Sequence, residues 1–304
     1  MLHTHSSAAP NFAGMPAAPL DLRTLLDRYR SALLASHGAS EAKAILRAVC
    51  AGLIGVRLPE LEPEKLLSTA QAEQMQQVFG RIVAGEPVQY ALGFVEFHGL
   101  RIAVDPRVLI PRPETEELVD LIIRSCSKAP ARIVDVGTGS GCIALALKKA
   151  FPAAQVFGLD ISAGALELAA ENARANHLEV QWSNTDALGE ALPQWMRSML
   201  NGPGNLLVSN PPYVPLSDSN TMQAQVFGHE PHLALFVDNA DPQQFFRAIA
   251  HAAAPALHPG DSVWFEGHYR HALESVRVVK QTGIPHAELI ADLSGNPRFI
   301  HAWM

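Results

Sequence analysis

The sequence predicts an α/β protein: a small helical domain at the N-terminus, followed by a largely parallel β-sheet with helices on both faces. Between residues 20 and 84, apolar residues recur at three- and four-residue steps, which is the spacing of one buried helix face. From Arg132 onward, short runs of β-forming residues alternate with helical stretches. Such alternation is typical of parallel strands joined by crossover helices.

Three apolar stripes, within residues 22–34, 42–49 and 75–82, predict three to five short helices in the N-terminal domain. Gly38 falls between the first two stripes, as a residue that ends a helix does. The preceding segment, 1–19, is rich in Ala, Pro and Ser but has neither the basic start nor the apolar run of a signal peptide. We therefore expect a disordered tail there.

The segment after the helical domain is rich in β-forming residues, interrupted by Gly93 and Gly99. This pattern predicts a β-hairpin that links the two domains. Thr115, near the end of the segment, is expected to cap the helix that follows. The expected organisation is a disordered tail, a helical domain, a hairpin linker and an α/β domain, over residues 1–19, 20–85, 86–115 and 116–304.

Seven strands are expected in the α/β domain, with helices between most of them. In such sheets ligands bind at the carboxyl ends of the strands, so the residues that directly follow a strand are the candidates for a site. The expected strands are 133–136, 156–159, 180–182, 206–209, 262–266, 287–292 and 299–303, and the expected helices are 143–150, 163–176 and 242–254.

The chain has 30 acidic and 23 basic residues, and its formal net charge of -7 argues against a protein whose main task is to grip nucleic-acid phosphates. No run reaches the roughly 18 apolar residues of a membrane span. The three cysteines are widely spaced, which fits a reducing cytoplasm. The 13 histidines form no recognisable ligand motif, so no metal is expected.

A glycine-rich turn follows the first strand of the α/β domain and leads directly into a helix. Glycines let such a turn approach a ligand without Cβ clashes. A dinucleotide-binding G-x-G-x-x-G pattern would need its third glycine at Cys142, which disfavours that class of cofactor. The observed G-x-G-x-G spacing after Asp135 resembles motif I of the S-adenosylmethionine-dependent methyltransferases. This resemblance implies S-adenosylmethionine as the cofactor, bound by Gly137, Thr138, Gly139, Ser140 and Gly141.

Two acidic residues at the ends of the next two strands extend the expected cofactor site. Asp160 can accept hydrogen bonds from both ribose hydroxyls, and the alternative role of capping the helix after it stays open. Asp186 is placed like the acidic residue beside the adenine amine in these methyltransferases, with Ala187 next to the ring.

The strand at 206–209 runs into Asn210, Pro211, Pro212 and Tyr213. Prolines lack an N–H donor and cannot continue a central strand, so the minimal interpretation is a rigid turn. A flat –NH2 group has two donors, which the Asn210 side-chain oxygen and the Pro211 carbonyl can accept, while Tyr213 can stack on it. We expect these four residues to bind the substrate of an amino-methyltransferase, with Asn210, Pro211 and Tyr213 catalytic and Asn210 also contacting the cofactor.

Residues 85–116, which include GEPVQY and LIPRPETE, resemble the HemK-type protein glutamine methyltransferases, in particular the branch acting on peptide chain release factors. FGHEPHLALF at 227–236 and the glycine and arginine at 295–298 extend the resemblance. It implies a Rossmann-like class I methyltransferase domain with a seven-stranded mixed sheet, and a helical domain that docks the release factor. It also implies methylation of N5 of the glutamine in the Gly-Gly-Gln loop.

The same resemblance implies that Phe97, Arg112 and Glu116 wall the site, and the alternative roles of core packing and of an ion pair at a helix start stay open. We expect a cytoplasmic monomer that contacts neither nucleic acid nor a membrane directly. One departure from the family is residues 266–271, EGHYRH, where an E-x-G-x-x-Q-like pattern is common.

Three alternative functions stay open at this stage. A ribosomal-protein glutamine methyltransferase performs the same chemistry, although the P-E-T-E run at 113–116 favours release factors. An adenine N6 methyltransferase would need a basic groove and a flipped base, and the loop 214–225 has no cluster of Lys or Arg. A cofactor-binding scaffold without catalysis would have no need for Asn210 and Tyr213.

Overall fold

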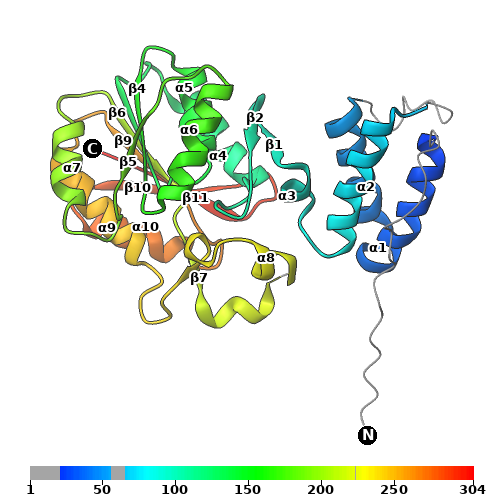
Figure 1. Ribbon diagram of the computed structural model, residues 1–304. Coiled ribbons are helices and arrows are strands. Elements are labelled where there is room, and N and C mark those ends of the chain that lie inside the picture. The colour runs from blue at the N-terminus through cyan, green and yellow to red at the C-terminus, as the bar shows by residue number, and fades with distance from the viewer. Residues whose placement is uncertain (1–20, 56–65, 223) are drawn as a thin grey trace, which may run out of the picture. The chain divides into compact units, whose positions relative to one another are not determined.

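The computed structural model describes residues 21–55, 66–222 and 224–304 (Figure 1). The chain divides into two compact units, Met1–Gly93 and Phe94–Met304, and each is described by itself. The expected disordered tail lies outside the described residues. Within those ranges, none of the helices combines the length and the apolar character that a membrane span needs.

The described part of the first unit consists of helices. The first of them begins after Asp21, whose side chain accepts a hydrogen bond from the backbone N–H of Thr24 over 2.8 Å. Gly38 has φ 71° and ψ 169°, so this element is two helices that meet at a kink. The bounds are α1 (Leu22–Ile54), α2 (Thr69–Val83) and α3 (Val88–Leu92).

The predicted apolar stripes form the core of the first unit, where Tyr29 of α1 stacks on Phe79 of α2 with ring centroids 4.5 Å apart. The expectation that residues 88–92 are part of a β-hairpin is wrong, because they form α3. Ala91 is buried against α1 and α2, and Gly93 ends the helix in the left-handed conformation. Packing against the bundle therefore overrides the local β preference of Val88 and Tyr90.

The second unit begins with an antiparallel hairpin of β1 (Phe94–Phe97) and β2 (Leu100–Ala103). His98 and Gly99 form its two-residue turn, with φ of 49° and 67°, as the tightest hairpin turns require. The buried side chain of Asn172 accepts the N–H of Ala103 over 2.7 Å and donates to the Ala103 carbonyl over 3.0 Å. These two bonds join the hairpin to the helix that carries Asn172.

A seven-stranded mixed sheet forms the centre of the second unit, in the order β10-β11-β9-β6-β3-β4-β5. All neighbouring strands are parallel except β11, which is antiparallel to both β9 and β10. Each predicted strand is present, and the predicted fold class is confirmed. The strands are β3 (Arg132–Val136), β4 (Gln155–Asp160), β5 (Gln181–Asn184), β6 (Asn205–Ser209), β9 (Ser262–Glu266), β10 (His286–Ala291) and β11 (Pro297–Trp303).

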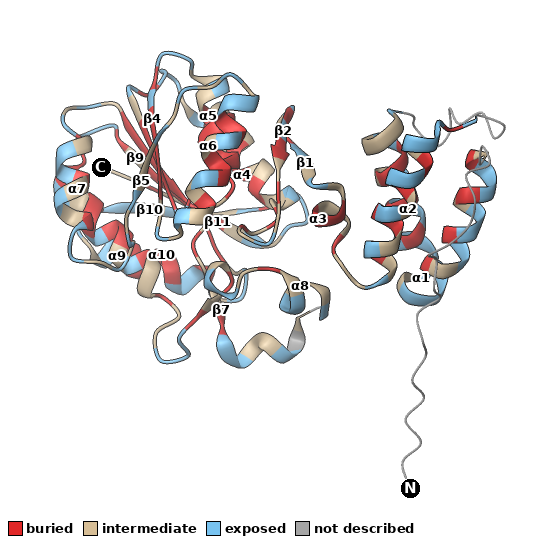
Figure 2. Ribbon diagram, viewed as in Figure 1, coloured by how far each residue is buried: buried red, intermediate tan, exposed pale blue. Residues whose placement is uncertain are grey.

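Helices cover both faces of this sheet (Figure 1). One apolar core joins the sheet to α7, α9 and α10, while α4, α5 and α6 pack on the opposite face; Figure 2 shows the buried strands between the two layers. Of these, α4 contains Thr115, and α7 and α10 are not among the helices expected between strands. The helices are α4 (Pro113–Ser125), α5 (Cys142–Ala150), α6 (Ala163–Ala175), α7 (Leu192–Met199), α9 (Gln244–Ala253) and α10 (Ala272–Gln281).

Residues 210–237, here called the insertion, leave the sheet after β6 and return before α9 (Figure 1). The ends of the insertion pair as short parallel strands, β7 and β8. The elements of the insertion are β7 (Val214–Pro215), a 3-10 helix (Leu216–Thr221), α8 (Ala224–His229), a 3-10 helix (His232–Ala234) and β8 (Phe236–Val237); a further 3-10 turn, Ala254–Ala256, extends α9.

Candidate functional site

A cavity of about 290 Å³ opens at the carboxyl ends of β3, β4 and β6. The turn after β3 and the residues after β4, β5 and β6 line it, and residues 107–109 and 111, which precede α4, lie across from them. This is the sheet edge where an α/β fold binds its ligands. We call it the first cavity.

The glycine-rich turn places its backbone at the wall of the first cavity, where Gly137, Thr138, Gly139 and Ser140 line it. Gly137 and Gly139 have φ of 73° and 54°, a region that only glycine enters readily. Gly141 is not a lining residue. It is the residue before α5, with φ 80°, and a Cβ added to it would stand 2.9 Å from the ring of Trp182 of β5.

Asp135 supports this turn from beneath. Its Oδ2 accepts hydrogen bonds from the Thr138 hydroxyl (2.6 Å) and the Ala144 N–H (3.2 Å), while its buried Oδ1 has no partner among the described residues. Burial raises the pKa of this carboxyl to about 7, with a smaller contribution from the nearby charge of Asp160. Asp135 thus holds the turn but does not line the cavity.

Asp160 and Asp186 both line the first cavity, as does Ala187. Asp160 accepts the N–H of Gly139 at Oδ2 and that of Ser162 at Oδ1, each over 2.9 Å. Desolvation raises its pKa in spite of these bonds. The cap of α6 is Ser162, so Asp160 does not cap that helix.

A second cavity, of about 370 Å³, lies beside the insertion. Asn210 and Pro211 line both cavities, as do Leu109 and Ala234, so the two spaces adjoin at the end of β6. Pro212 lines only the first cavity, whereas Tyr213 lines only the second. The N-P-P-Y run therefore stands at the junction between the two spaces.

Two site side chains are joined to one buried carboxylate, that of Glu266 at the end of β9. The Tyr213 hydroxyl donates to Glu266 Oε1 over 3.3 Å, and the Thr115 hydroxyl donates to Oε2 over 2.7 Å. Asn210 Nδ2 in turn donates to the Thr115 oxygen over 3.1 Å. Burial and the charge of Glu266 raise the pKa of Tyr213 far above its usual range, so its hydroxyl keeps its proton.

Thr115 does not cap α4, contrary to the prediction. Arg112 precedes the helix and Pro113 occupies its first turn. The Thr115 hydroxyl instead donates a hydrogen bond to Glu266. Proline is well suited to the first helical position because its missing N–H is not needed there.

The expected wall residues have different places. Arg112 lines the second cavity and donates to Oε1 of Glu230 over 2.5 Å. Phe97 is buried in the hairpin, and Glu116 accepts the His98 N–H over 2.7 Å; neither lines either cavity.

Sequence reasoning missed Thr115 as a site residue, together with Glu230 and Glu266. Glu266 had a usable signal, since it ends a strand of the parallel part of the sheet. Glu230, buried in the insertion, accepts both Arg112 and the Ile110 N–H, and only the fold brings these residues together. Among the residues that the structure describes, no group of three or more His, Cys, Asp or Glu side chains could hold a metal ion.

The chain resembles known proteins along most of its length. Residues 24–93 match the PrmC N-terminal domain and residues 116–235 match the Methyltransferase small domain. A release factor glutamine methyltransferase of Bacteroides thetaiotaomicron is 35% identical over 275 residues, which are 90% of this chain and 96% of the relative. The release factor glutamine methyltransferase of Deinococcus radiodurans is 34% identical over an alignment of 306 residues, which covers 99% of this chain and 96% of the relative.

Among solved structures, a methyltransferase from Pyrococcus furiosus is similar over 67% of this chain and 89% of its own, at 19% identity and a TM-score of 0.47. The identity to the two relatives, over nearly their whole length, decides the family. The chain belongs to the release factor glutamine methyltransferase family and is an S-adenosylmethionine-dependent methyltransferase.

Proposed function

We propose that this enzyme methylates N5 of the glutamine in the Gly-Gly-Gln motif of peptide chain release factors. The observation that carries the proposal is the junction of the two cavities at Asn210 and Pro211. A methyl donor in one cavity and a planar amide in the other would meet there. The substrate class is supported by relatives that are named release factor glutamine methyltransferase.

We assign the cofactor to the first cavity. Its glycine-rich wall lets a ligand approach the backbone, and its carboxylates suit hydroxyls, an amine and positive charge. S-adenosylmethionine supplies, when bound, an electrophilic methyl group on a sulfonium. The residues assigned to its binding are Gly137, Thr138, Gly139, Ser140, Asp160, Asp186, Ala187 and Asn210, with Gly141 fixing the start of α5.

We assign the glutamine side chain to the second cavity. An amide nitrogen is a poor nucleophile because its lone pair is delocalised into the carbonyl group. Asn210 Oδ1 and the Pro211 carbonyl would accept its two hydrogens, fixing the nitrogen with its lone pair toward the first cavity. Tyr213 would pack against the flat amide, with Pro212 shaping the exit from β6.

An adenine N6 substrate is disfavoured by the charges at the site. Arg107 and Arg112 are the only Lys or Arg side chains among the described residues that line the two cavities. Arg107 is paired with Asp105 at 2.7 Å and Arg112 with Glu230 at 2.5 Å. Neither side chain is left to neutralise a nucleic-acid phosphate.

We propose that residues 20–85 dock the release factor, and that residues 86–115 link them to the methyltransferase domain at 116–304. We further propose that the enzyme works in the cytoplasm as a monomer. The described cysteines, Cys50, Cys126 and Cys142, form no disulfide, in keeping with a reducing compartment.

The test is methyl transfer from labelled S-adenosylmethionine to three separate acceptors: a release factor, a mixture of ribosomal proteins and adenine-containing oligonucleotides. We expect label in the release factor alone. Label in the ribosomal proteins would transfer the proposal to that substrate, and label in the oligonucleotides would reject an amide acceptor.

A further inference from the structure

One buried carboxylate accepts hydrogen bonds from two different elements of the site. Glu266 is 1% exposed, and its two oxygens accept the hydroxyls of Thr115 (2.7 Å) and Tyr213 (3.3 Å). Thr115 belongs to α4 and Tyr213 to the insertion, while Glu266 ends β9. The carboxylate therefore joins three segments that are far apart in the sequence.

The bond between Thr115 and Glu266 determines what Thr115 can offer to Asn210. A hydroxyl has a single hydrogen, and that of Thr115 is donated to Glu266. Toward Asn210 the Thr115 oxygen can act only as an acceptor, and Asn210 Nδ2 donates to it over 3.1 Å. Thr115 is 2% exposed, so solvent offers it little competition as a partner.

This arrangement fixes which end of the Asn210 amide faces the substrate. With Nδ2 bound to Thr115, Oδ1 is the end left to accept a hydrogen from an incoming –NH2 group. The opposite orientation would present a donor to a donor, which gives no hydrogen bond. The Pro211 carbonyl could then still accept one hydrogen, but the nitrogen would no longer be fixed at two points.

We propose that Glu266 and Thr115 are positioning residues that set the orientation of the Asn210 amide, and that Glu266 also holds the Tyr213 ring in place beside it. This inference rests on the proposed function, because it assigns Asn210 Oδ1 to the acceptor amide. Neither positioning residue has to touch the substrate. Glu266 acts on Asn210 through two successive hydrogen bonds, one with Thr115 and one from Asn210 to Thr115, and it acts on Tyr213 through a single direct one.

The test compares Thr115→Val, which keeps the shape and removes the hydroxyl, with Thr115→Ser, which restores it. We expect Thr115→Val to lower kcat by about 10- to 100-fold, since misplacement of a reacting group costs up to about 100-fold in rate. We expect the KM for the release factor and the dissociation constant for S-adenosylmethionine to change much less. Thr115→Ser should recover most of the lost turnover.

Thr282→Val is the matched control. Its hydroxyl also makes a 2.7 Å bond, to the carbonyl of Val279, but it lies at the end of α10 and lines neither cavity. We expect parental kinetics from it. Glu266→Gln is the independent variant: a neutral amide has one oxygen for two hydroxyl donors, so turnover should again fall.

Full turnover in Thr115→Val or Glu266→Gln would overturn the inference, and so would a Thr115→Ser variant as slow as Thr115→Val. If Thr115→Val does not fold, Glu266→Gln decides: reduced turnover supports the inference and full turnover overturns it. Failure of the proposed function would show in the parent enzyme, which would leave the release factor unlabelled, whereas failure of this inference would show only in the variants.

Discussion

Gly158 of β4 lies directly against the indole ring of Trp182, its partner on β5. A Cβ added to Gly158 would stand 2.3 Å from Cζ3 of the ring, and one added to Gly141 would stand 2.9 Å from Cη2. The ring thus fills the space that side chains at these two glycines would need. Because Gly141 precedes α5, the packing of β5 and the geometry of the glycine-rich turn depend on each other.

We therefore predict that Gly158→Ala lowers the free energy of unfolding by about 1–3 kcal/mol, the usual cost of overpacking a core. Urea unfolding followed by tryptophan fluorescence measures it. Gly228→Ala is the matched control, since a Cβ there meets nothing within 4 Å. In a double-mutant cycle with Trp182→Leu, the two effects should be less than additive. Strict additivity would show that Gly158 and Trp182 are not coupled.

Asn210→Ala should lower turnover by about 100-fold or more while leaving most of the cofactor affinity. The variant loses the oxygen proposed to hold the acceptor amide, and misplacement of a reacting group costs on the order of 100-fold in rate. Calorimetry with S-adenosylmethionine and single-turnover kinetics with a release factor separate the two effects. Asn201→Ala, which alters an exposed asparagine before β6, is the control. Parental turnover in Asn210→Ala would remove Asn210 from the mechanism.

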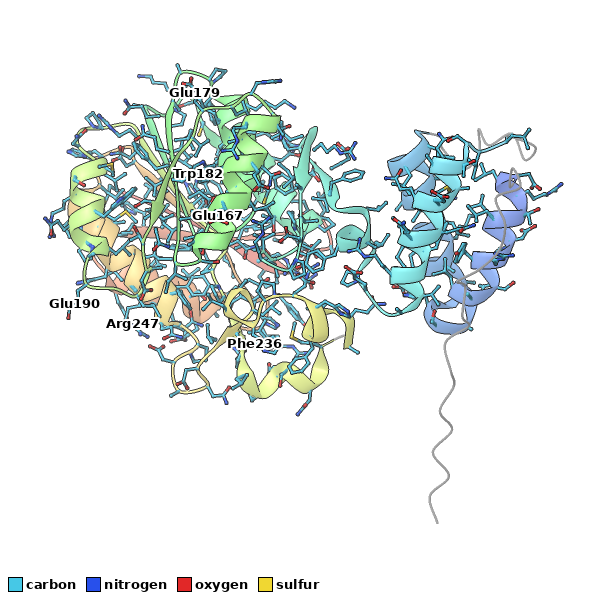
Figure 3. All side chains as sticks on the ribbon, viewed as in Figure 1. Glu167, Glu179, Trp182, Glu190, Phe236 and Arg247 are labelled. Atoms are coloured by element: carbon cyan, nitrogen blue, oxygen red, sulfur yellow. The ribbon has the colours of Figure 1, made fainter. Side chains whose placement is uncertain are left out.

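Asp160→Ala is expected to raise the dissociation constant for S-adenosylmethionine by about 10- to 100-fold, the range for losing hydrogen bonds to a charged group. The carboxylate also accepts the Gly139 N–H, so thermal stability should be checked alongside. Glu190→Ala is the control, because Glu190 is exposed and extends from the surface (Figure 3). An unchanged dissociation constant in Asp160→Ala would show that the ribose contact lies elsewhere.

The stability of the second unit should depend on pH through Asp135. Burial raises its pKa from an ordinary value of 3.8 to about 7, so the folded state holds the proton more tightly than the unfolded state does. The stability contributed by the protonated group is complete below about pH 4 and is lost as the pH rises to about 7.

Asp135→Asn removes this titration. We predict that the parent, compared with Asp135→Asn, is relatively less stable at pH 8 than at pH 5, as measured by urea unfolding. All four tryptophans, at 182, 195, 264 and 303, lie in the second unit, so their fluorescence reports on it. If the difference in stability between parent and variant is the same at both pH values, the Asp135 carboxyl does not have the raised pKa that we assign to it.

The strands were predictable because β3 and β6 are buried on both faces and therefore read as short, continuous apolar runs. The apolar residues of α7, at 192, 195, 196 and 199, have helical spacing, but a pattern over only eight residues predicts a helix weakly. α10 was obscured by Val276, Val278 and Val279, which favour strands. Short elements of this kind depend on packing against a sheet that local patterns do not describe.

The candidate site divides in the same way. Residues that directly follow strands, such as Asp160 and Asn210, could be found from the sequence because sheet topology alone brings them to one edge. Thr115 and Glu266 could not be paired, since their contact depends on how α4 packs beside β9. Glu230 likewise gains its role only when the insertion folds back onto residues 110–112.

The most direct test of the account is tandem mass spectrometry of a release factor after incubation with the enzyme and S-adenosylmethionine. We predict one added methyl group, located on the glutamine of the Gly-Gly-Gln peptide, and far less methylation with Asn210→Ala. A methyl group on any other residue, or an unmodified Gly-Gly-Gln peptide with active enzyme, would contradict it.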